Sequence, residues 1–257
     1  IRRGLVESLA KAGLVIDGLH AQLSSMRSRK DAYEIDCLRR AIAITQAAFR
    51  EAAVDIRPGS SEAAVDGALL RGVRRRGGRP AYPFVVASGG HAAIPHYFRN
   101  DADLDEGVAL LIDAGAAWDR YAADITRVFP VSGRFTPRQR EIYGIVLRAQ
   151  AAAIAAVRPG ASFAKVDAAA RKVIADAGYG QHFIHGTSHH VGLDVHDPGP
   201  TKLEPGMTFT IEPGIYLEKE RLGIRIEDIV LVTETGCEVL TRDLPKSIEA
   251  IEALVQR

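Results

Sequence analysis

The feature that most constrains this chain is an internal repeat. The segment 56–66, Ile-Arg-Pro-Gly-Ser-Ser-Glu-Ala-Ala-Val-Asp, returns at 157–167 as Val-Arg-Pro-Gly-Ala-Ser-Phe-Ala-Lys-Val-Asp, and the same offset of 101 positions carries Gly77 onto Gly178. Units of about 100 residues are too long for solenoid repeats, whose periods run from about 20 to 50 residues. The repeat therefore predicts a single domain with pseudo-two-fold symmetry.

Two helices are predicted at the start of each half. A long Ala-rich amphipathic helix is expected at about 30–54 and again at about 137–157, and each ends at the repeated Arg-Pro-Gly, where proline stops the helix and glycine permits a turn. A second helix should follow, with Ser60 or Ser61 as its N-cap in the first half and Ser162 in the second. The tail 245–257 reads as a further short amphipathic helix.

Strands rich in β-branched residues and bounded by Gly and Pro are predicted after each helix pair. They are expected at 82–87, 108–113 and 122–130 in the first half, and at 208–215, 223–232 and 238–240 in the second. Helices precede strands in both halves, which predicts an α+β domain with a mostly antiparallel sheet and helices packed against it. With 257 residues, 47% of them hydrophobic, the chain can bury a substantial core.

Composition argues against several partners. The net charge of +1 provides no field to attract nucleic acid or an anionic membrane, and the short basic clusters are interpreted as solvated helix faces. No apolar run approaches the roughly 20 residues of a membrane span, and the first residues do not form a signal peptide. Cys37 and Cys237 lack CxxC spacing, which favours a reducing compartment and predicts a cytoplasmic protein.

Histidines and carboxylates are concentrated on the predicted strands and the loop before them. Four of the eight histidines fall within 185–196. Asp113 ends a buried strand and Asp124 lies in the next, while Glu212 and Glu227 lie in strands of the second half, 99 and 103 positions further on. These offsets are close to 101, so each half is predicted to supply two acidic groups from equivalent places, converging near the pseudo-dyad.

Four converging carboxylates require compensating cations. Held a few Å apart in one pocket, they would repel by roughly 4 kcal/mol per close pair at an effective dielectric near 20. One divalent ion would leave two negative charges uncancelled, whereas two ions balance all four. Oxygen-rich ligation with a single imidazole suits Mn²⁺, Co²⁺, Fe²⁺ or Zn²⁺, while a Ca²⁺ site would not require histidine.

Each acidic residue taken alone also has a simpler interpretation. Asp113 could be a turn residue at a strand end, Asp124 could form a salt bridge with Arg127, and Glu227 could pair with Arg225. Their joint spacing favours the metal site.

Six short motifs together resemble a known family. They are Asp-Ala-Gly-Ala at 113–116, Asp-Ile-Thr-Arg at 124–127, His-Gly-Thr-Ser-His at 185–189, Val-His-Asp at 195–197, Ile-Glu-Pro-Gly-Ile-Tyr at 211–216 and Arg-Ile-Glu-Asp at 225–228. The pattern, which covers about 30–257, is similar to the pita-bread metallopeptidases of the aminopeptidase P and prolidase branch. The resemblance implies a pita-bread fold, with a curved, mostly antiparallel sheet covered by helices, around a dinuclear metal centre.

The resemblance also implies a role for each acidic residue. Asp113 would chelate one metal, Asp124 and Glu227 would bridge both, and His189 and Glu212 would each complete one coordination sphere. Glu212 would in addition be the general base on the bridging water.

Further positions match residues that the family uses around its substrate. His96 and His196 would contact the scissile carbonyl and the tetrahedral intermediate, and His185 would line the pocket on the proline side. Tyr82 and Arg225, also at this pocket, would orient the bridging carboxylates. His91 departs from the pattern, because relatives commonly carry asparagine there.

The implied activity is that of an Xaa-Pro aminopeptidase, a metal-dependent exopeptidase that hydrolyses the bond before a penultimate proline by attack of a metal-bridging hydroxide. Its cofactor would be two divalent ions, first Mn²⁺, with Zn²⁺ or Co²⁺ also acceptable, and its partners short proline-containing peptides rather than nucleic acid or membrane. An Xaa-Pro dipeptidase (prolidase) is the alternative. Lys202 is the only cation at 197–203, where dipeptide-specific relatives often place arginine, which favours the aminopeptidase.

Three other interpretations fit less well. A methionine aminopeptidase would share the five metal ligands but usually has a different histidine context, and a creatinase-like hydrolase would have lost them. A non-catalytic pita-bread binding module would be expected to have eroded ligands.

The domain boundary is expected near position 26. Residues 1–26 would be the remnant or linker of an upstream N-terminal domain, with a helix at 4–12 and an apolar stretch at 14–19, and residues 27–257 the catalytic domain. The full-length form is expected to be a homodimer.

Overall fold

The computed structural model describes residue 8, residues 11–13 and residues 19–256. Only residues 8, 11 and 12 of the helix expected at 4–12 and residue 19 of the apolar stretch expected at 14–19 are described, so both stay predictions. The helix α2 (His20–Ser28) crosses the expected boundary at 26/27. Within the described part of the chain, no helix is both long and apolar enough to cross a membrane.

The first half contains two further helices and two small antiparallel sheets. α3 (Ala32–Ala52) continues into η1 (Ala53–Asp55), and α4 (Glu62–Arg74) follows. One sheet joins β2 (Val85–Ser88), β3 (Ala109–Ala114) and β6 (Ile125–Pro130), and the other joins β1 (Arg79–Pro80), β4 (Ala116–Trp118) and β5 (Tyr121–Ala122), with η2 (Gly89–Ala93) after β2.

The second half repeats this order. α5 (Pro137–Ala156) and α6 (Phe163–Asp176) precede η3 (Gly180–His182), and β7 (Thr208–Ile211), β10 (Asp228–Val232) and β11 (Cys237–Val239) form a sheet. β8 (Gly214–Leu217) and β9 (Leu222–Arg225) form a hairpin around η4 (Glu218–Glu220), and α7 (Ile248–Val255) ends the domain. All strand pairings are antiparallel among the described residues.

Local sequence explains where the helices begin. Ser61 and Ser162 accept hydrogen bonds from the backbone three residues on, which confirms them as N-caps. Asp31 and Thr136 form reciprocal capping boxes with the third residue of their helices, and Pro137 occupies the first position of α5. Both long helices therefore start within two residues of the predicted positions.

The strands are interrupted at three of the four predicted acidic ligands. Asp124 lies between β5 and β6, Glu212 between β7 and β8, and Glu227 between β9 and β10. The prediction of continuous strands at 122–130, 208–215 and 223–232 was therefore wrong. Pro213 has no N–H to donate to a ladder, and a break lets the preceding carboxylate turn out of the sheet. Only Asp113 lies inside a strand.

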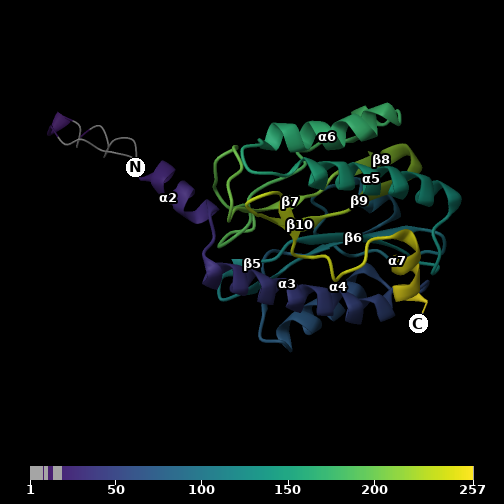
Figure 1. The fold of residues 1–257 in the computed structure, drawn as a ribbon. Helices are drawn as coiled ribbons and strands as arrows, with labels where there is room; N and C mark the ends of the chain where they lie inside the picture. The colour runs from purple at the N-terminus through teal and green to yellow at the C-terminus, as the bar shows by residue number, and fades with distance from the viewer. Residues whose placement is uncertain (1–7, 9–10, 14–18, 257) are drawn as a thin grey trace.

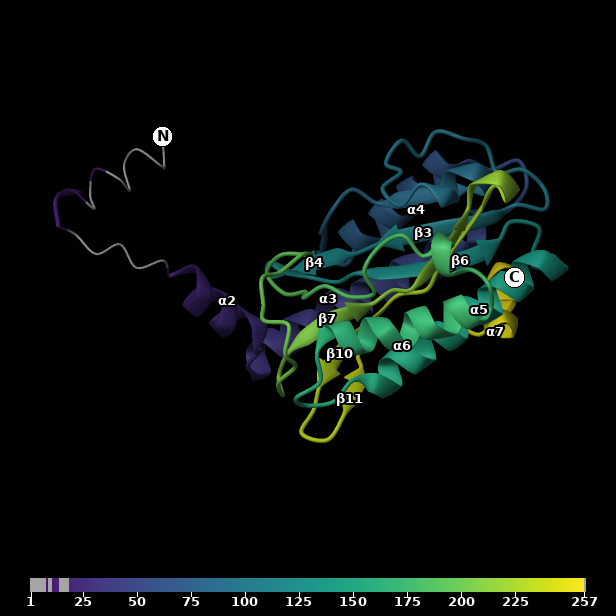
Figure 2. The ribbon, with the colours of Figure 1, turned by 90° about the horizontal axis from the view of Figure 1, so that it is seen from above.

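The helices flank the strands. Figure 1 shows the strands between α5 and α6 on one side and α3 and α4 on the other, and Figure 2 shows the same separation from above. α3 packs against α4 and α5 against α6, while β9 of the second half lies against β3 and β6 of the first. The two halves therefore meet through their strands.

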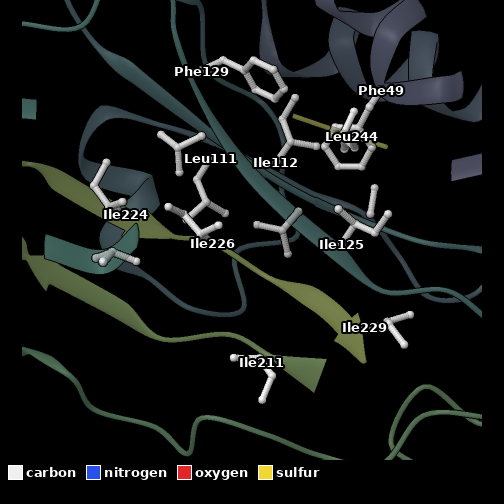
Figure 3. Close-up of a cluster of buried hydrophobic side chains, with 14 of the residues drawn as sticks. Phe49, Leu111, Ile112, Ile125, Phe129, Ile211, Ile224, Ile226, Ile229 and Leu244 are labelled. Carbon is white, nitrogen blue, oxygen red and sulfur yellow. The ribbon is translucent and has the colours of Figure 1, made fainter. Parts of the chain in front are cut away.

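One hydrophobic core spans this junction. Figure 3 shows Leu111, Ile112 and Ile125 of the first half close to Ile224 and Ile229 of the second, and each is at most 1% exposed. Burying a side chain of this size stabilises the fold by about 1.5–3 kcal/mol. The halves are thus parts of one domain, as the repeat predicted.

A buried ion pair crosses the same junction. Arg127 and Asp228, which the repeat places at equivalent positions, are both inaccessible to solvent, with Nη2 and Oδ1 2.7 Å apart. Arg127 also donates to the backbone oxygens of Glu227 and Leu244, at 2.6 and 2.9 Å. The Arg127 guanidinium therefore binds groups at the junction of the halves and forms no salt bridge with Asp124, so that interpretation of Asp124 is excluded.

Candidate metal centre and active site

A cavity of about 510 Å³ opens between the two halves, near the strand interruptions. All ten residues predicted at the site line it: Tyr82, His96, Asp113, Asp124, His185, His189, His196, Glu212, Arg225 and Glu227. Four come from the first half and six from the second. The structure therefore brings together every residue that the sequence analysis assigned to the site.

The centre of the cavity is an imidazole surrounded by carboxylates. Asp124, His189 and Glu227 each offer a ligand atom, and these atoms lie within 4.8 Å of one another. His189 Nε2 is 3.5 Å from Asp124 Oδ2 and 3.3 Å from Glu212 Oε1. This spacing is suited to a cation that the oxygen and nitrogen donors share.

Asp113 is linked to this cluster through a tyrosine. The Tyr82 hydroxyl lies 2.7 Å from Asp113 Oδ1 and also contacts a carboxylate oxygen of Asp124. Gly115 allows the close approach of the two chain segments, because a Cβ there would lie 1.8 Å from the Ala123 carbonyl oxygen. Tyr82 thus contacts one of the two carboxylates predicted to bridge the metals, Asp124, while its other partner is Asp113 and not Glu227.

Arg225 contacts a different carboxylate from the ones expected. Its Nη2 donates to Asp113 Oδ2 at 2.5 Å, and its Nε donates to Thr126 Oγ1 at 3.1 Å. Thr126 Oγ1 in turn donates to Glu227 Oε2 at 2.6 Å. Arg225 therefore reaches a predicted bridging carboxylate only through Thr126, and a direct Glu227–Arg225 salt bridge is excluded.

The pKa shifts of the residues at the centre of the cavity indicate an excess of negative charge there. Burial raises the pKa of Asp113 to about 7, although Arg225 opposes the shift. Burial also raises the pKa of Glu227 well above its usual range, and Asp124 and Glu212 raise it further. Burial lowers the pKa of His189, but the two neighbouring carboxylates outweigh it and hold the value well above normal. Carboxylates that retain protons beside a protonated imidazole fit a site built for divalent cations.

The other predicted histidines occupy the walls of the cavity. His185 Nε2 lies 2.7 Å from the Tyr216 hydroxyl, and the ring centroids of His189 and His196 are 4.2 Å apart. Burial lowers the pKa of both His185 and His196, so each is neutral near pH 7 and can donate one ring N–H. The His96 ring stacks against the Phe98 ring, with the two ring centroids 6.0 Å apart.

The loop that carries His96 is fastened by a residue that the sequence analysis missed. Glu62, fully buried at the start of α4, accepts hydrogen bonds from Ser88 N at 2.7 Å and from Ala102 N at 3.0 Å, one on each side of the loop. His91 Nδ1 lies 3.1 Å from the same carboxylate, so the departure at His91 concerns this anchor and not the cavity wall. The repeat could have pointed to Glu62, because the equivalent position of the second half, 101 residues on, is the apolar Phe163.

Three further cavity or contact residues were not predicted. Thr126 and Tyr216 hold Glu227 and His185 as described, and both belong to motifs already noted. The Ser188 hydroxyl lies in the cavity wall, buried and without a hydrogen-bond partner among the described residues. Thr126 could have been found from its offset of 101 to Glu227, and Ser188 lies within the motif at 185–189.

Comparison with known proteins identifies the family. Residues 36–234, more than three quarters of the chain, match the model of metallopeptidase family M24. The chain belongs to this family. It is 38% identical to an Xaa-Pro aminopeptidase of Escherichia coli, over 99% of this chain and 65% of that protein, and 38% identical to an Xaa-Pro dipeptidase of Pyrococcus furiosus, over 86% and 65%.

Solved structures confirm the fold. A proline aminopeptidase P II from Yersinia pestis matches with a TM-score of 0.88 at 39% identity, over 93% of this chain and 62% of that one. Aminopeptidase P from Escherichia coli, in a low-pH form, also gives a TM-score of 0.88, at 38% identity over the same shares. The predicted pita-bread, α+β fold is thus confirmed, while the chain spans less than two thirds of these relatives.

Proposed function

We propose that the protein is an Xaa-Pro aminopeptidase, which removes the N-terminal residue of a peptide whose second residue is proline. One observation carries the proposal: a single cavity contains four carboxylates and four histidines, and three of these residues, Asp124, His189 and Glu227, offer ligand atoms within 4.8 Å of one another. Relatives named Xaa-Pro aminopeptidase, at 38% and 39% identity, support the same activity.

The metal ligands would be Asp113, Asp124, His189, Glu212 and Glu227. We propose two ions, because four carboxylates need two divalent charges, and Mn²⁺ in preference to Zn²⁺ or Co²⁺, because the donors are mostly oxygen. When bound, the ions would acidify a water and polarise the substrate carbonyl.

The protein side chains would supply the proton chemistry. Burial raises the pKa of Glu212, but His189 outweighs it and holds the pKa below its usual range, so Glu212 is ionised and can accept the proton of the attacking water. His96 and His196 would donate to the developing oxyanion, where each donor is worth about 10² to 10³ in rate. His185 would bound the pocket for the proline ring.

An Xaa-Pro dipeptidase is the second candidate, supported by the Pyrococcus furiosus relative. The decisive assay uses the metal-loaded full-length protein with Xaa-Pro dipeptides, Xaa-Pro-Yaa tripeptides and Xaa-Ala-Yaa tripeptides. We expect cleavage before proline in the tripeptides, slower turnover of dipeptides and none of the alanine series. Metal-free protein and Glu212→Gln are the controls. Cleavage of dipeptides alone would assign the protein as a prolidase, and failure to cleave any Xaa-Pro bond would refute both candidates.

We further propose that residues 1–26 connect to an upstream domain, that 27–257 is the catalytic domain, and that the full-length protein is a cytoplasmic homodimer. Leu19, Leu23 and Met26, in and beside α2, are 66%, 53% and 72% exposed, which supports packing of this helix against a further part of the protein. Light scattering of the full-length protein tests the dimer.

A further inference from the structure

A second and larger cavity, of about 800 Å³, adjoins the candidate active site. Val195 and His196 line both cavities. Along β5 and the turn after it the chain passes from one cavity to the other, because Ala122 lines the second cavity and Asp124 the first. The two cavities are therefore neighbours that share a wall at a proposed oxyanion histidine.

The second cavity contains two arginines without partners. Arg79 and Arg120 line it, and neither guanidinium group forms an ion pair or a hydrogen bond with any described residue. Its acidic residues are occupied, since Asp194 pairs with Arg27 at 2.6 Å and Asp119 accepts a hydrogen bond from the Tyr33 hydroxyl. The cavity thus offers two guanidinium groups that form no ion pair within the described part of the chain, while the Asp119 carboxylate keeps its negative charge.

Arg120 is presented by a strained turn. Asp119 and Arg120 are the two residues between β4 and β5, and their φ angles are 46° and 75°. Positive φ at both positions of such a hairpin favours Asn-Gly, so an arginine is costly there. The turn is held in place by the Tyr33 contact and by the Arg40 guanidinium, 5.2 Å from the Trp118 ring centre.

We propose that the second cavity binds the C-terminal part of the peptide substrate, with Arg79 and Arg120 recognising its α-carboxylate. The inference rests on the proposed function. An enzyme that removes one N-terminal residue has only that residue on the amino side of the scissile bond, so a large adjoining cavity has room for the carboxyl side. Two unpaired guanidinium groups would also repel the substrate's α-ammonium group and bind a carboxylate.

The test compares free-acid and C-terminally amidated Xaa-Pro peptides of three to six residues, with the metal-loaded full-length protein. In the parent we expect KM to be lower for the acid at the length that reaches the arginines. Arg79→Gln with Arg120→Gln should raise KM for that acid about tenfold, the scale of one charge-assisted hydrogen bond, and leave kcat and the amide KM unchanged. Arg134→Gln removes an arginine that lines neither cavity and is the matched control.

A second variant separates charge from folding. Arg120→Gly suits the positive φ, so we expect a higher Tm together with an acid-to-amide KM ratio shifted in the same direction as in Arg120→Gln. If the parent cleaves Xaa-Pro bonds but the variants have the same acid-to-amide KM ratio as the parent at every peptide length, the inference is overturned and the proposed function stands. A parent that cleaves no Xaa-Pro bond would overturn both.

Discussion

The two halves share a helical frame but differ beside their first core strand. In the first half β2 pairs with β3, and all four residues of β2 are buried. In the second half residues 187–190 lie beside β7 and the residue after it, joined by backbone hydrogen bonds from Thr210 N and Glu212 N of 2.9 and 2.8 Å and by the bridge from His190 to Phe209. A buried strand in one half thus corresponds to a segment with two histidines in the other.

The difference shows which parts of the site follow the repeat. Asp113 and Asp124 correspond to Glu212 and Glu227, and His96 corresponds to His196 at an offset of 100 positions. The other imidazoles have no counterpart, because the positions 101 residues before His185 and His189 are Phe84 and Ser88. The carboxylates and the proposed oxyanion donors therefore come from both halves, while the proposed ligand imidazole comes from the second half alone.

The largest effect is expected when the carboxylate symmetry is broken. Asp124→Asn and Glu227→Gln remove equivalent carboxylates from the two halves, and each should lower metal content and reduce kcat/KM by about 10³-fold or more, since several kcal/mol of charge stabilisation is lost with the metal. Metal analysis and kinetics measure both. The exposed Asp105→Asn and Glu234→Gln are matched controls. Full metal content and activity in either cavity variant would show that its half does not contribute a ligand.

The second test removes the ion pair between the halves. Asp228→Asn leaves Arg127 buried without its countercharge, which should lower the free energy of unfolding by about 3–5 kcal/mol at pH 7. Burial raises the pKa of Asp228, but Arg127 and Lys246 outweigh it and hold the pKa below its usual value. The stabilisation is therefore present above the unfolded pKa of about 3.9 and is lost as pH falls through the folded pKa.

Urea unfolding of parent and variant from pH 3 to 7 measures this contribution. We expect the difference between the two free energies of unfolding to be constant above about pH 5 and to narrow as pH falls below about 4. A constant gap across the range would mean that the charge of Asp228 contributes nothing to holding the halves together.

Smaller losses are expected from the wall histidines. His96→Ala and His196→Ala, one in each half, should retain metal but lose about 10² to 10³ in kcat, the usual effect of removing one oxyanion donor. Single-turnover kinetics and metal analysis check the two parts. Near-parental kcat in both variants with Xaa-Pro substrates would rule out the proposed roles, and a loss in only one would show that the oxyanion contacts are not symmetrical.

The smallest effect is expected from the residues that fasten the loops. Glu62 anchors the loop of His96, and Asp167 anchors the loop of His185 by accepting from Thr187 N at 3.1 Å and Thr187 Oγ1 at 2.7 Å. Glu62→Gln should lower kcat about tenfold, because small misplacements of a catalytic group are costly, and Asp167→Asn about threefold, because that side chain is 29% exposed. A lower kcat with unchanged KM and metal content would show that these residues position the loops. Unchanged kcat with altered KM or metal content would contradict that role.

Several features followed from local sequence. The helix boundaries depend on caps and breakers that act within four residues, so Ser61, Ser162 and the Arg-Pro-Gly turns could be located directly. The site residues were found because two independent patterns, the repeat offset and the six motifs, both point to the same carboxylates. Glu62 escaped notice because its partners, from Ser88 to Ala102, are brought to it only by the loop's return to α4.

The sequence alone determined the doubled architecture, the helices and the set of residues at the site, because these depend on periodicity, on capping and on side-chain chemistry. Only the tertiary structure decided how those residues are used. It interrupted the strands at Asp124, Glu212 and Glu227, assigned Arg127 to Asp228 and Arg225 to Asp113, and placed a second cavity, lined by Arg79 and Arg120, beside the site. Such choices depend on distances between segments about 100 residues apart, which packing sets and local sequence does not encode.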